Sequence, residues 1–155
     1  MDQNEFFMLE ALKLAEISYL NNDIPIGCVV VYDNKIIGRG YNRKELLNDA
    51  SEHAEIMALK EACKNLNTYH LEDCNIYITL EPCAMCSGAI INFRINNVFI
   101  GTENKRFGTC GSFINLLDMD FNHRSNIIFG VLKEDCSNII SKFFKNLRNQ
   151  KKVEG

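Results

Sequence analysis

The sequence predicts an α/β layered domain built on a mixed sheet. After an initial hairpin, strand-like segments alternate with helical ones, which is the pattern of a layered α/β fold. The 155 residues are enough to bury a substantial core, and a composition of 46% hydrophobic and 24% charged residues is typical of a soluble globular protein. No internal repeat, low-complexity tract or Gly/Ser linker divides the chain. Residues 1–155 are therefore expected to form one domain.

The first half of the chain predicts a helix, a hairpin and a second helix. Apolar residues recur at helical spacing over residues 6–20. The β-branched segment 24–32 and the segment 35–42 are separated by an Asp-Asn pair, so they are expected to form a tight hairpin. Ser51 is predicted to cap a helix that continues over 52–66.

The second half predicts three further strands, each followed by a helix. These elements are a strand at 75–80, a helix that begins at Pro82, a strand at 96–101, a helix near 112–118, a strand at 126–131 and a helix from about Glu134. Pro82 suits the first position of a helix, where the missing N–H costs nothing.

The charge of the chain is unevenly distributed. The net charge is −3, yet residues 142–155 contain five Lys and Arg residues against one Glu. A basic C-terminal helix or tail is therefore expected at about 134–155. It can serve as an electrostatic handle for phosphates or simply as a solvated helix face.

The cysteines and the N-terminus favour a cytoplasmic address. The chain has seven cysteines, an odd number, and begins with an acidic amphipathic segment rather than a secretory signal. Reduced thiols are expected in such a protein. No apolar run approaches the roughly 20 residues needed to span a bilayer, so no membrane association is expected.

The motif EPCAMC (81–86) places two thiols three residues apart at the expected start of a helix. There the helix dipole favours the thiolate form of Cys83 and Cys86. Such a pair can bind a metal, carry out redox chemistry or fill a core. A third ligand would distinguish metal binding from the other two.

His53 and Glu55 are candidates to complete a metal site. Both belong to the first turn of the helix predicted after Ser51, where side chains lean toward the N-terminus and can converge beyond it. His53 with Cys83 and Cys86 would form a zinc site of three ligands and one open position, the catalytic pattern. Zinc would generate hydroxide near neutral pH, and Glu55 would take the proton and pass it to the substrate. H-x-E followed about thirty residues later by P-C-x-x-C is the signature of zinc nucleobase deaminases.

Seven stretches of the sequence match one family of proteins. They are IPIGCVVV (24–31), GYN (40–42), HAEIMAL (53–59), TLEPCAMCSGAI (79–90), GTCGS (108–112), NHR (122–124) and FFKNLR (143–148). In these stretches the chain resembles the bacterial tRNA adenosine deaminases, the TadA family, and the resemblance covers nearly the whole chain. The zinc motifs are common to the wider deaminase superfamily, whereas the later stretches select the tRNA-editing branch.

The resemblance implies a fold, a reaction and partners. The fold is a three-layer, cytidine-deaminase-like one, with a mixed five-stranded sheet and helices on both faces. The reaction is zinc-dependent hydrolytic deamination of adenosine to inosine at the anticodon wobble position of tRNA, which releases ammonia. The partners are one Zn²⁺ per subunit, the anticodon stem-loop of tRNA-Arg and a second subunit in a homodimer.

The resemblance also implies roles for single residues. Pro25 and Ile26 would form the apolar walls around a base that has left its stack, while Asn42 and the backbone N–H of Ala54 would read its polar edge. Glu55 would protonate N1 of the ring and later the departing amine.

Further RNA contacts are implied by stacking and by phosphate neutralisation. The residues assigned to them are Asn104, Lys105, Arg106, Phe143, Phe144, Lys145 and Arg148. At least one of the two phenylalanines is expected to pack mainly in the core. Asn104 stands where the family usually carries Asp, so it keeps the size of that residue and lacks its carboxylate. Ala50 replaces a proline that is common before the His helix.

Two other functions fit part of the pattern. A deaminase of free bases or nucleosides, such as guanine or cytosine, would use the same fold and metal but would have no use for a basic tail. A non-enzymatic zinc or redox module would use Cys83 and Cys86 structurally and would give Glu55 no role.

Overall fold

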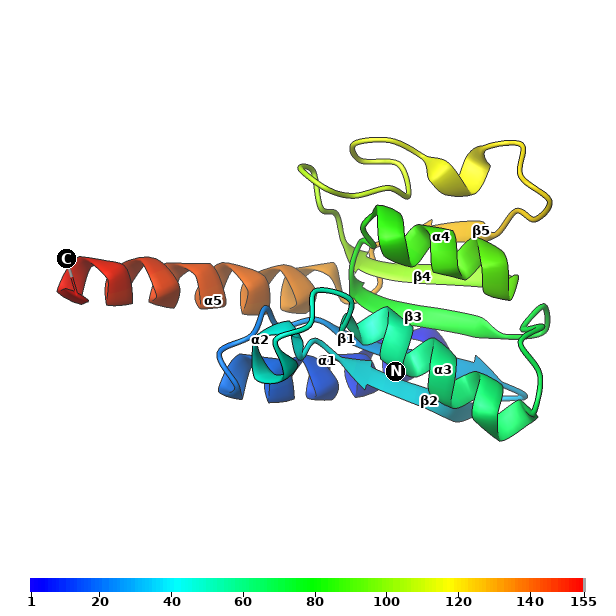
Figure 1. The fold of residues 1–155 in the computed structure, drawn as a ribbon, viewed down its shortest axis with the longest axis horizontal. Coiled ribbons are helices and arrows are strands. Elements are labelled where there is room, and N and C mark those ends of the chain that lie inside the picture. The colour runs from blue at the N-terminus through cyan, green and yellow to red at the C-terminus, as the bar shows by residue number, and fades with distance from the viewer. Residues whose placement is uncertain (155) are drawn as a thin grey trace.

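The computed structural model describes residues 1–154 and contains a five-stranded sheet of order β2-β1-β3-β4-β5 (Figure 1). The strands are β1 (Gly27–Tyr32), β2 (Lys35–Tyr41), β3 (Asn75–Leu80), β4 (Asn97–Thr102) and β5 (Asn126–Phe129). Strand β1 is antiparallel to both β2 and β3, whereas β3, β4 and β5 are parallel. The predicted mixed five-stranded sheet is confirmed.

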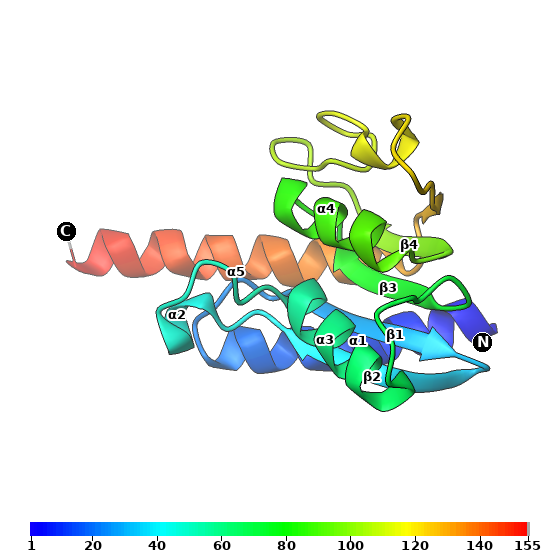
Figure 2. The ribbon, with the colours of Figure 1, turned by 45° about the vertical axis from the view of Figure 1, so that its right-hand side comes forward.

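Helices cover both faces of this sheet, which makes three layers (Figures 1 and 2). They are α1 (Gln3–Leu20), the short α2 (Lys44–Leu47), α3 (Ala54–Leu66), α4 (Ala84–Phe93), the 3₁₀ turn η1 (Leu116–Asp118) and α5 (Lys133–Glu154). Helices α3 and α4 pack on one face, and α1 and the start of α5 pack on the other. Helix α2 was not predicted.

Strand β1 shows why the sheet is buried on both faces. Cys28 and Val30 belong to the core beneath α3 and α4, whereas Val29 and Val31 belong to the core beneath α1. Successive side chains of a strand point to opposite faces, so a continuous apolar run is what a sheet covered on both sides requires.

The hairpin between β1 and β2 turns at Asp33 and Asn34. Both residues have positive φ, 50° and 61°. This is the type I′ geometry whose twist matches that of the flanking strands, and Asp and Asn tolerate it well. The predicted tight hairpin is confirmed.

Helix α3 begins later than predicted. Its N-cap residue is His53, not Ser51. The His53 carbonyl accepts a helical hydrogen bond from the Met57 amide at 3.2 Å. The Ser51 hydroxyl instead donates to the Asp49 carboxylate at 2.7 Å. A local side-chain bond thus replaces the expected cap.

Helix α4 also begins later than predicted, at Ala84 with Cys83 as its N-cap residue. Pro82 therefore precedes the helix instead of opening it. The Pro82 carbonyl accepts hydrogen bonds from both the amide and the hydroxyl of Thr109, each at 3.0 Å. A contact with a segment distant in the sequence therefore fixes where this helix begins.

The prediction of a helix near 112–118 is wrong, because only the single turn η1 is helical there. The Ser112 amide donates to the Glu81 carboxylate, and the next two amides donate to the Gly108 carbonyl. These bonds hold the chain in an irregular loop.

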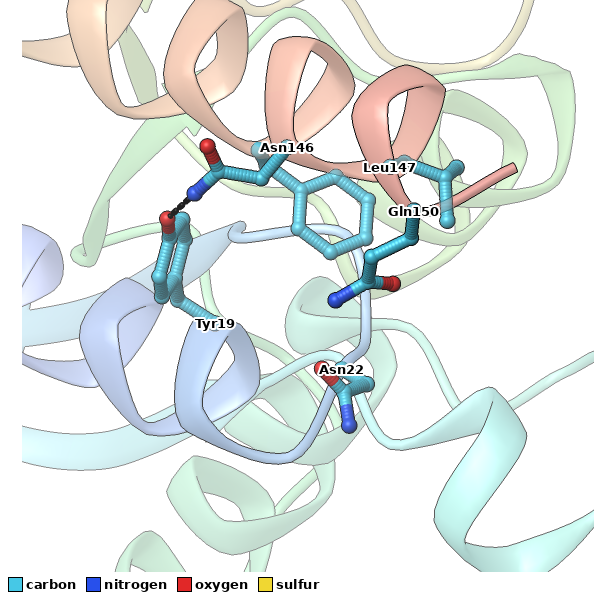
Figure 3. Close-up of a pocket in the computed structure, with 6 residues that line it drawn as sticks. Tyr19, Asn22, Asn146, Leu147 and Gln150 are labelled. Atoms are coloured by element: carbon cyan, nitrogen blue, oxygen red, sulfur yellow. Dashed lines mark hydrogen bonds between the residues drawn. The ribbon is translucent and has the colours of Figure 1, made fainter. Parts of the chain in front are cut away.

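Helix α5 packs on the body only over its first part and then extends away from it (Figures 1 and 2). Helix α5 contacts α1 at Tyr19, whose ring lies edge-on to Phe143 with centroids 6.0 Å apart. The Asn146 amide donates to the Tyr19 hydroxyl (Figure 3). Beyond this point the helix carries the basic tail. Over residues 1–154, no helix has the length and apolarity that crossing a membrane requires.

Candidate active site

The starts of helices α3 and α4 meet beside the C-terminal end of β3. His53 caps α3 and Cys83 caps α4, both with extended backbone, and neither side chain forms a capping hydrogen bond. Both side chains are therefore free to project beyond the helix starts. Cys86 lies in the first turn of α4 and is buried.

The geometry of these three residues suits a tetrahedral metal ion. His53 Nδ1 lies 3.6 Å from Cys83 Sγ and 3.5 Å from Cys86 Sγ. The three ligand atoms lie within 4.8 Å of one another. A tetrahedral ion with metal–ligand bonds of about 2.0–2.3 Å separates its ligand atoms by roughly 3.5 Å. Within the described chain, this His/Cys/Cys group could therefore hold a metal ion.

The thiol chemistry of the pair is consistent with this role. A hydrogen bond from the Cys86 thiol lowers the pKa of the Cys83 thiol to about 3, and a second bond from His53 acts in the same direction. Cys83 is therefore a thiolate, the form that binds metals. The local geometry thus prepares at least one anionic ligand.

Glu55 lies beside this group with a carboxylate that is not satisfied by the protein. Its side chain is only 3% exposed, and Oε1 has no hydrogen-bond partner among residues 1–154. Burial raises the pKa of the Glu55 carboxyl above its ordinary value. Leaving a buried polar atom unpaired costs free energy, so such an atom calls for a partner that the protein does not supply.

A cavity of about 590 Å³ opens at this group, within the size range of small-molecule sites. Nine residues predicted for the site line it: Ile26, Asn42, His53, Glu55, Cys83, Asn104, Lys105, Arg106 and Phe144. The structure thus brings together the His/Cys/Cys group, Glu55 and part of the predicted substrate contacts.

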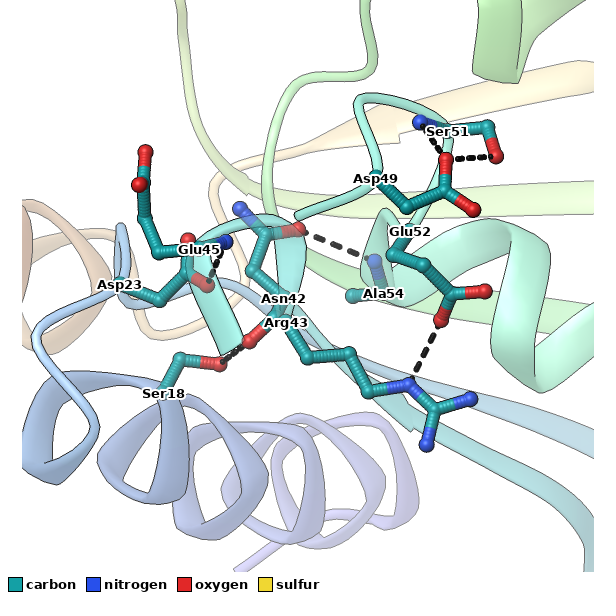
Figure 4. A network of polar contacts seen from close by, with 9 residues as sticks. All are labelled: Ser18, Asp23, Asn42, Arg43, Glu45, Asp49, Ser51, Glu52 and Ala54. Atoms are coloured by element: carbon teal, nitrogen blue, oxygen red, sulfur yellow. Dashed lines mark hydrogen bonds and ion pairs between the residues drawn. The ribbon is translucent and has the colours of Figure 1, made fainter. Parts of the chain in front are cut away.

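Asn42 is fixed in the cavity wall through both its side chain and its backbone (Figure 4). Its Oδ1 accepts a hydrogen bond from the Ala54 amide at 3.0 Å, and its carbonyl accepts one from the Ser18 hydroxyl at 2.7 Å. The Ala54 amide, predicted to bind substrate directly, therefore orients Asn42 instead, and Ala54 does not line the cavity. Since Oδ1 is engaged, Asn42 offers its Nδ2 donor to a ligand.

The loop around Asn42 is held by further polar contacts (Figure 4). Asp23, which is completely buried, accepts hydrogen bonds from the amides of Ile24 and Glu45 at 3.2 and 2.9 Å. Arg43 forms an ion pair with Glu52 at 2.6 Å. This wall of the cavity is therefore preorganised.

Other predicted substrate contacts lie elsewhere. Pro25 is buried and does not line the cavity. Phe143 is 9% exposed and packs between α5 and α1, beside a small cavity of about 140 Å³ (Figure 3). Its environment is that of a core residue, as was expected for at least one of the two phenylalanines. Lys145 and Arg148 are exposed on the extended part of α5 and stand outside the cavity.

Seven lining residues were not predicted from the sequence. They are Ile24, Lys44, Leu80, Glu81, Glu103, Phe107 and Ile140. Ile140 could have been found, because it lies four residues before Phe144 and hence on the same face of α5. Lys44 carries no motif signal, because the fold brings it to the cavity through the unpredicted helix α2.

Comparisons with known proteins agree over nearly the whole chain. The MafB19-like deaminase family model matches residues 1–148. A tRNA-specific adenosine deaminase of Streptococcus pyogenes is 45% identical over 154 residues, covering 99% of this chain and 90% of that protein. A tRNA-specific adenosine deaminase of Bacillus subtilis is 40% identical over 154 residues, covering 99% of this chain and 96% of that protein. A chain solved in studies of A-to-I editing by tRNA:A34 deaminases at the wobble position of transfer RNA has a TM-score of 0.83 at 32% identity. That alignment covers 86% of this chain and 98% of the solved one.

Proposed function

The chain belongs to the tRNA-specific adenosine deaminase family, and from this premise we infer that it converts adenosine to inosine at the wobble position of tRNA. The observation that carries the inference is the 45% identity over 99% of the chain. The His/Cys/Cys group and the unpaired carboxylate oxygen of Glu55 are consistent with it. The reaction is hydrolytic, so water replaces the exocyclic amine and ammonia leaves.

His53, Cys83 and Cys86 are proposed to hold one zinc ion per chain. Such an ion, when bound, supplies a water molecule whose pKa is lowered toward 7. The tetrahedral fit of the three ligand atoms and the thiolate character of Cys83 support this assignment.

Glu55 is proposed to move the protons. Its free Oε1 is the acceptor for the first proton that water gives up, and it passes this proton to N1 of the adenine ring. The same atom would then take the second proton, from the new hydroxyl group on C6, and deliver it to the leaving amine. Burial raises the pKa of Glu55, so the carboxyl can hold each proton between its uptake and its delivery. A carboxyl whose pKa lies nearer the working pH is a more effective proton shuttle.

Asn42 is proposed to bind the target base through Nδ2, which is the donor left free by the bond from Ala54 to Oδ1. An Nδ2 donor requires an acceptor on the base, and the unprotonated ring nitrogens of adenine are acceptors. Ile26 lines the same cavity and would contact the face of the base, a role that buried Pro25 cannot share.

Asn42→Asp tests this role, because aspartate keeps the acceptor for the Ala54 amide and removes the Nδ2 donor. We expect kcat/KM for an anticodon stem-loop to fall about ten- to a hundredfold, since the hydrogen bond to the bound base is removed. The kcat/KM of Asn42→Ala, which removes both bonds, should fall further. The thermal stability of Asn42→Asp should stay closer to that of the wild type than that of Asn42→Ala does. Unchanged kcat/KM in Asn42→Asp would exclude Asn42 from binding the base.

The surface around the cavity suits a nucleic acid better than a free base. A second cavity of about 440 Å³ adjoins the catalytic one and shares Ile24, Lys44 and Phe144 with it. This groove leads toward α5, where Lys145 and Arg148 are exposed. We propose that flanking nucleotides follow the groove, with Phe144 stacking on a base and Lys44, Lys105, Arg106, Lys145 and Arg148 contacting phosphates.

Neutralising the tail should weaken tRNA binding and flatten its salt dependence. The variant carries K145Q, R148Q, K151Q and K152Q, four exposed residues of α5. For each phosphate that the variant no longer neutralises, the slope of log K against log[salt] should shrink by about 0.7. The measurement is fluorescence anisotropy with a labelled stem-loop over a range of salt concentrations.

A matched control neutralises four exposed lysines that do not line the catalytic cavity, namely Lys13, Lys35, Lys60 and Lys64. It changes the net charge by the same amount and should leave the slope nearly unchanged. Equal slopes in the tail variant and the wild type would make the tail a solvated helix face only.

We also propose a homodimer in the cytoplasm. Support for the dimer comes from large apolar side chains exposed on and near α4 and η1, among them Met85 (40%), Phe113 (67%) and Met119 (52%). Exposed apolar groups of this kind are typical of interfaces. Light scattering after size-exclusion chromatography would show a monomer if this proposal is wrong.

Inosine mapping in total tRNA, after incubation with the purified protein, tests the proposed function most directly. Inosine at the wobble position of tRNA-Arg is the expected result. A parallel assay offers free adenosine, cytidine and guanine. Activity on free bases alone would instead support the alternative, a deaminase of free bases or nucleosides on the same fold.

A further inference from the structure

The carboxylate of Glu81 lies deep in the protein without a basic partner. Glu81 directly follows β3, precedes the metal-binding Cys83 by two residues, and is 2% exposed. No ion pair involves it within residues 1–154. Burying a carboxylate costs free energy unless hydrogen bonds from the protein replace those from water. The donors that bind Glu81 therefore identify the segment that it holds in place.

All four side-chain hydrogen bonds of Glu81 come from one loop, residues 104–112. Oε1 accepts from the Asn104 amide at 3.1 Å and from the Ser112 hydroxyl. Oε2 accepts from the amides of Cys110 and Ser112 at 3.0 and 3.1 Å. Bonds to a charged acceptor are stronger than neutral ones. One side chain therefore fastens both ends of the loop.

The loop passes so close to Glu81 that it needs a glycine there. A Cβ on Gly108 would lie 2.4 Å from the Glu81 carboxylate and 2.4 Å from the Asn104 carbonyl oxygen. Only a residue without a side chain allows this approach. The described chain has no helix or strand between Thr102 and η1. The bonds to Glu81 therefore help to hold a segment that has no regular secondary structure.

The fastened loop forms one wall of the catalytic cavity. Its residues from Asn104 to Phe107 line the cavity together with Glu103. The same loop is also tied to the start of α4, because the Thr109 hydroxyl donates to the Pro82 carbonyl at 3.0 Å and its oxygen lies 2.7 Å from the hydroxyl oxygen of Ser87. The position of the cavity wall relative to the metal-binding helix thus depends on contacts made by this loop, and Glu81 makes four of them.

We propose that Glu81 is a positioning residue, which holds the 104–112 loop as a preformed wall against which the RNA substrate binds. This role rests on the proposed function. Glu81 neither donates nor accepts the protons of the reaction. It acts through the loop, so its loss raises KM for RNA more than it lowers kcat.

Glu81→Gln tests the proposal with minimal change of volume. The amide keeps one acceptor and turns an N–H₂ group toward the N–H donors of the loop, so about half of the bonds are removed. Trypsin can cleave the loop after Lys105 or Arg106, both exposed. With zinc content unchanged, we expect cleavage there to accelerate about tenfold, and KM for an anticodon stem-loop to rise about tenfold with a smaller change in kcat.

Val31→Ala is the control for a general loss of stability. Val31 is buried on the other face of the sheet, against α1. The Val31→Ala substitution should lower the melting temperature without accelerating cleavage at Lys105 and Arg106. Should Glu81→Gln fail to fold, Ser112→Ala removes one bond and should show the same changes at smaller size.

Proteolysis needs no RNA, so it separates this proposal from the proposed function. A wild-type protein that does not edit tRNA would refute the function and leave the loop result intact. Cleavage in Glu81→Gln no faster than in Val31→Ala would overturn the positioning role. So would a loss of kcat at unchanged KM.

Discussion

Replacing Glu55 with glutamine should reduce turnover by a factor of about 10³ while one zinc ion stays bound. The amide fills the same buried space next to the His/Cys/Cys group but cannot take a proton from water at neutral pH. The group that could hold the ion consists of His53, Cys83 and Cys86 without Glu55, so metal binding should not depend on Glu55. The measurements are single-turnover kinetics on an anticodon stem-loop and zinc content by mass spectrometry.

Glu61→Gln is the matched control. Glu61 lies on the same helix α3 but is exposed and bonds only to the Arg39 amide, at 3.2 Å. It should retain nearly wild-type turnover. Full activity of Glu55→Gln would remove Glu55 from the mechanism, and loss of zinc from that variant would make it a ligand. The second outcome would also favour a structural metal module over an enzyme.

Replacing Cys86 with serine should abolish both zinc binding and activity. The Cys86 sulfur is one of the three atoms proposed to hold the ion, and it also donates the bond that lowers the pKa of Cys83. Its loss therefore weakens two ligands at once, and we expect kcat/KM to fall at least about a thousandfold. Because a bound metal stabilises the folded state, the melting temperature should fall as well.

The Cys63→Ser variant separates metal loss from the general effect of changing a cysteine. Cys63 lies on α3 outside the His/Cys/Cys group, so this variant should keep its zinc. Chelation of the wild-type protein should reproduce the Cys86→Ser phenotype, and added zinc should restore only the wild type. A Cys86→Ser variant with a full complement of zinc would rule out Cys86 as a ligand.

The sequence predicted most of the fold because its signals are local. The Asp33–Asn34 pair specifies a hairpin turn through its own backbone preferences, and the alternation of apolar segments specifies the layers. The two helix starts were each misplaced by two residues, because Ser51 and Pro82 have good local signals for a start. Their observed partners, Asp49 and Thr109, override those signals.

Residues that act through distant contacts could not be assigned in the same way. The motif around Cys83 predicts a role for the thiols. The partners of Glu81 lie 23 to 31 residues away in an irregular loop, so no local pattern indicates them. The segment wrongly predicted as a helix begins at Ser112, the last residue of this loop. The Ala54 amide likewise pairs with Asn42 across 12 residues, a contact that no periodicity indicates.

The extended second half of α5 allows recognition to change independently of folding. Phe143 and Asn146 contact Tyr19 of α1, and Leu147 and Gln150 line the cavity beside it. Beyond them, residues 151–153 are exposed, so substitutions there cost the fold little stability. Selection can therefore adjust the charge and length of this arm to different RNA partners without first compensating for a weakened core. The catalytic cavity, held by buried carboxylates and helix caps, has much less of this freedom.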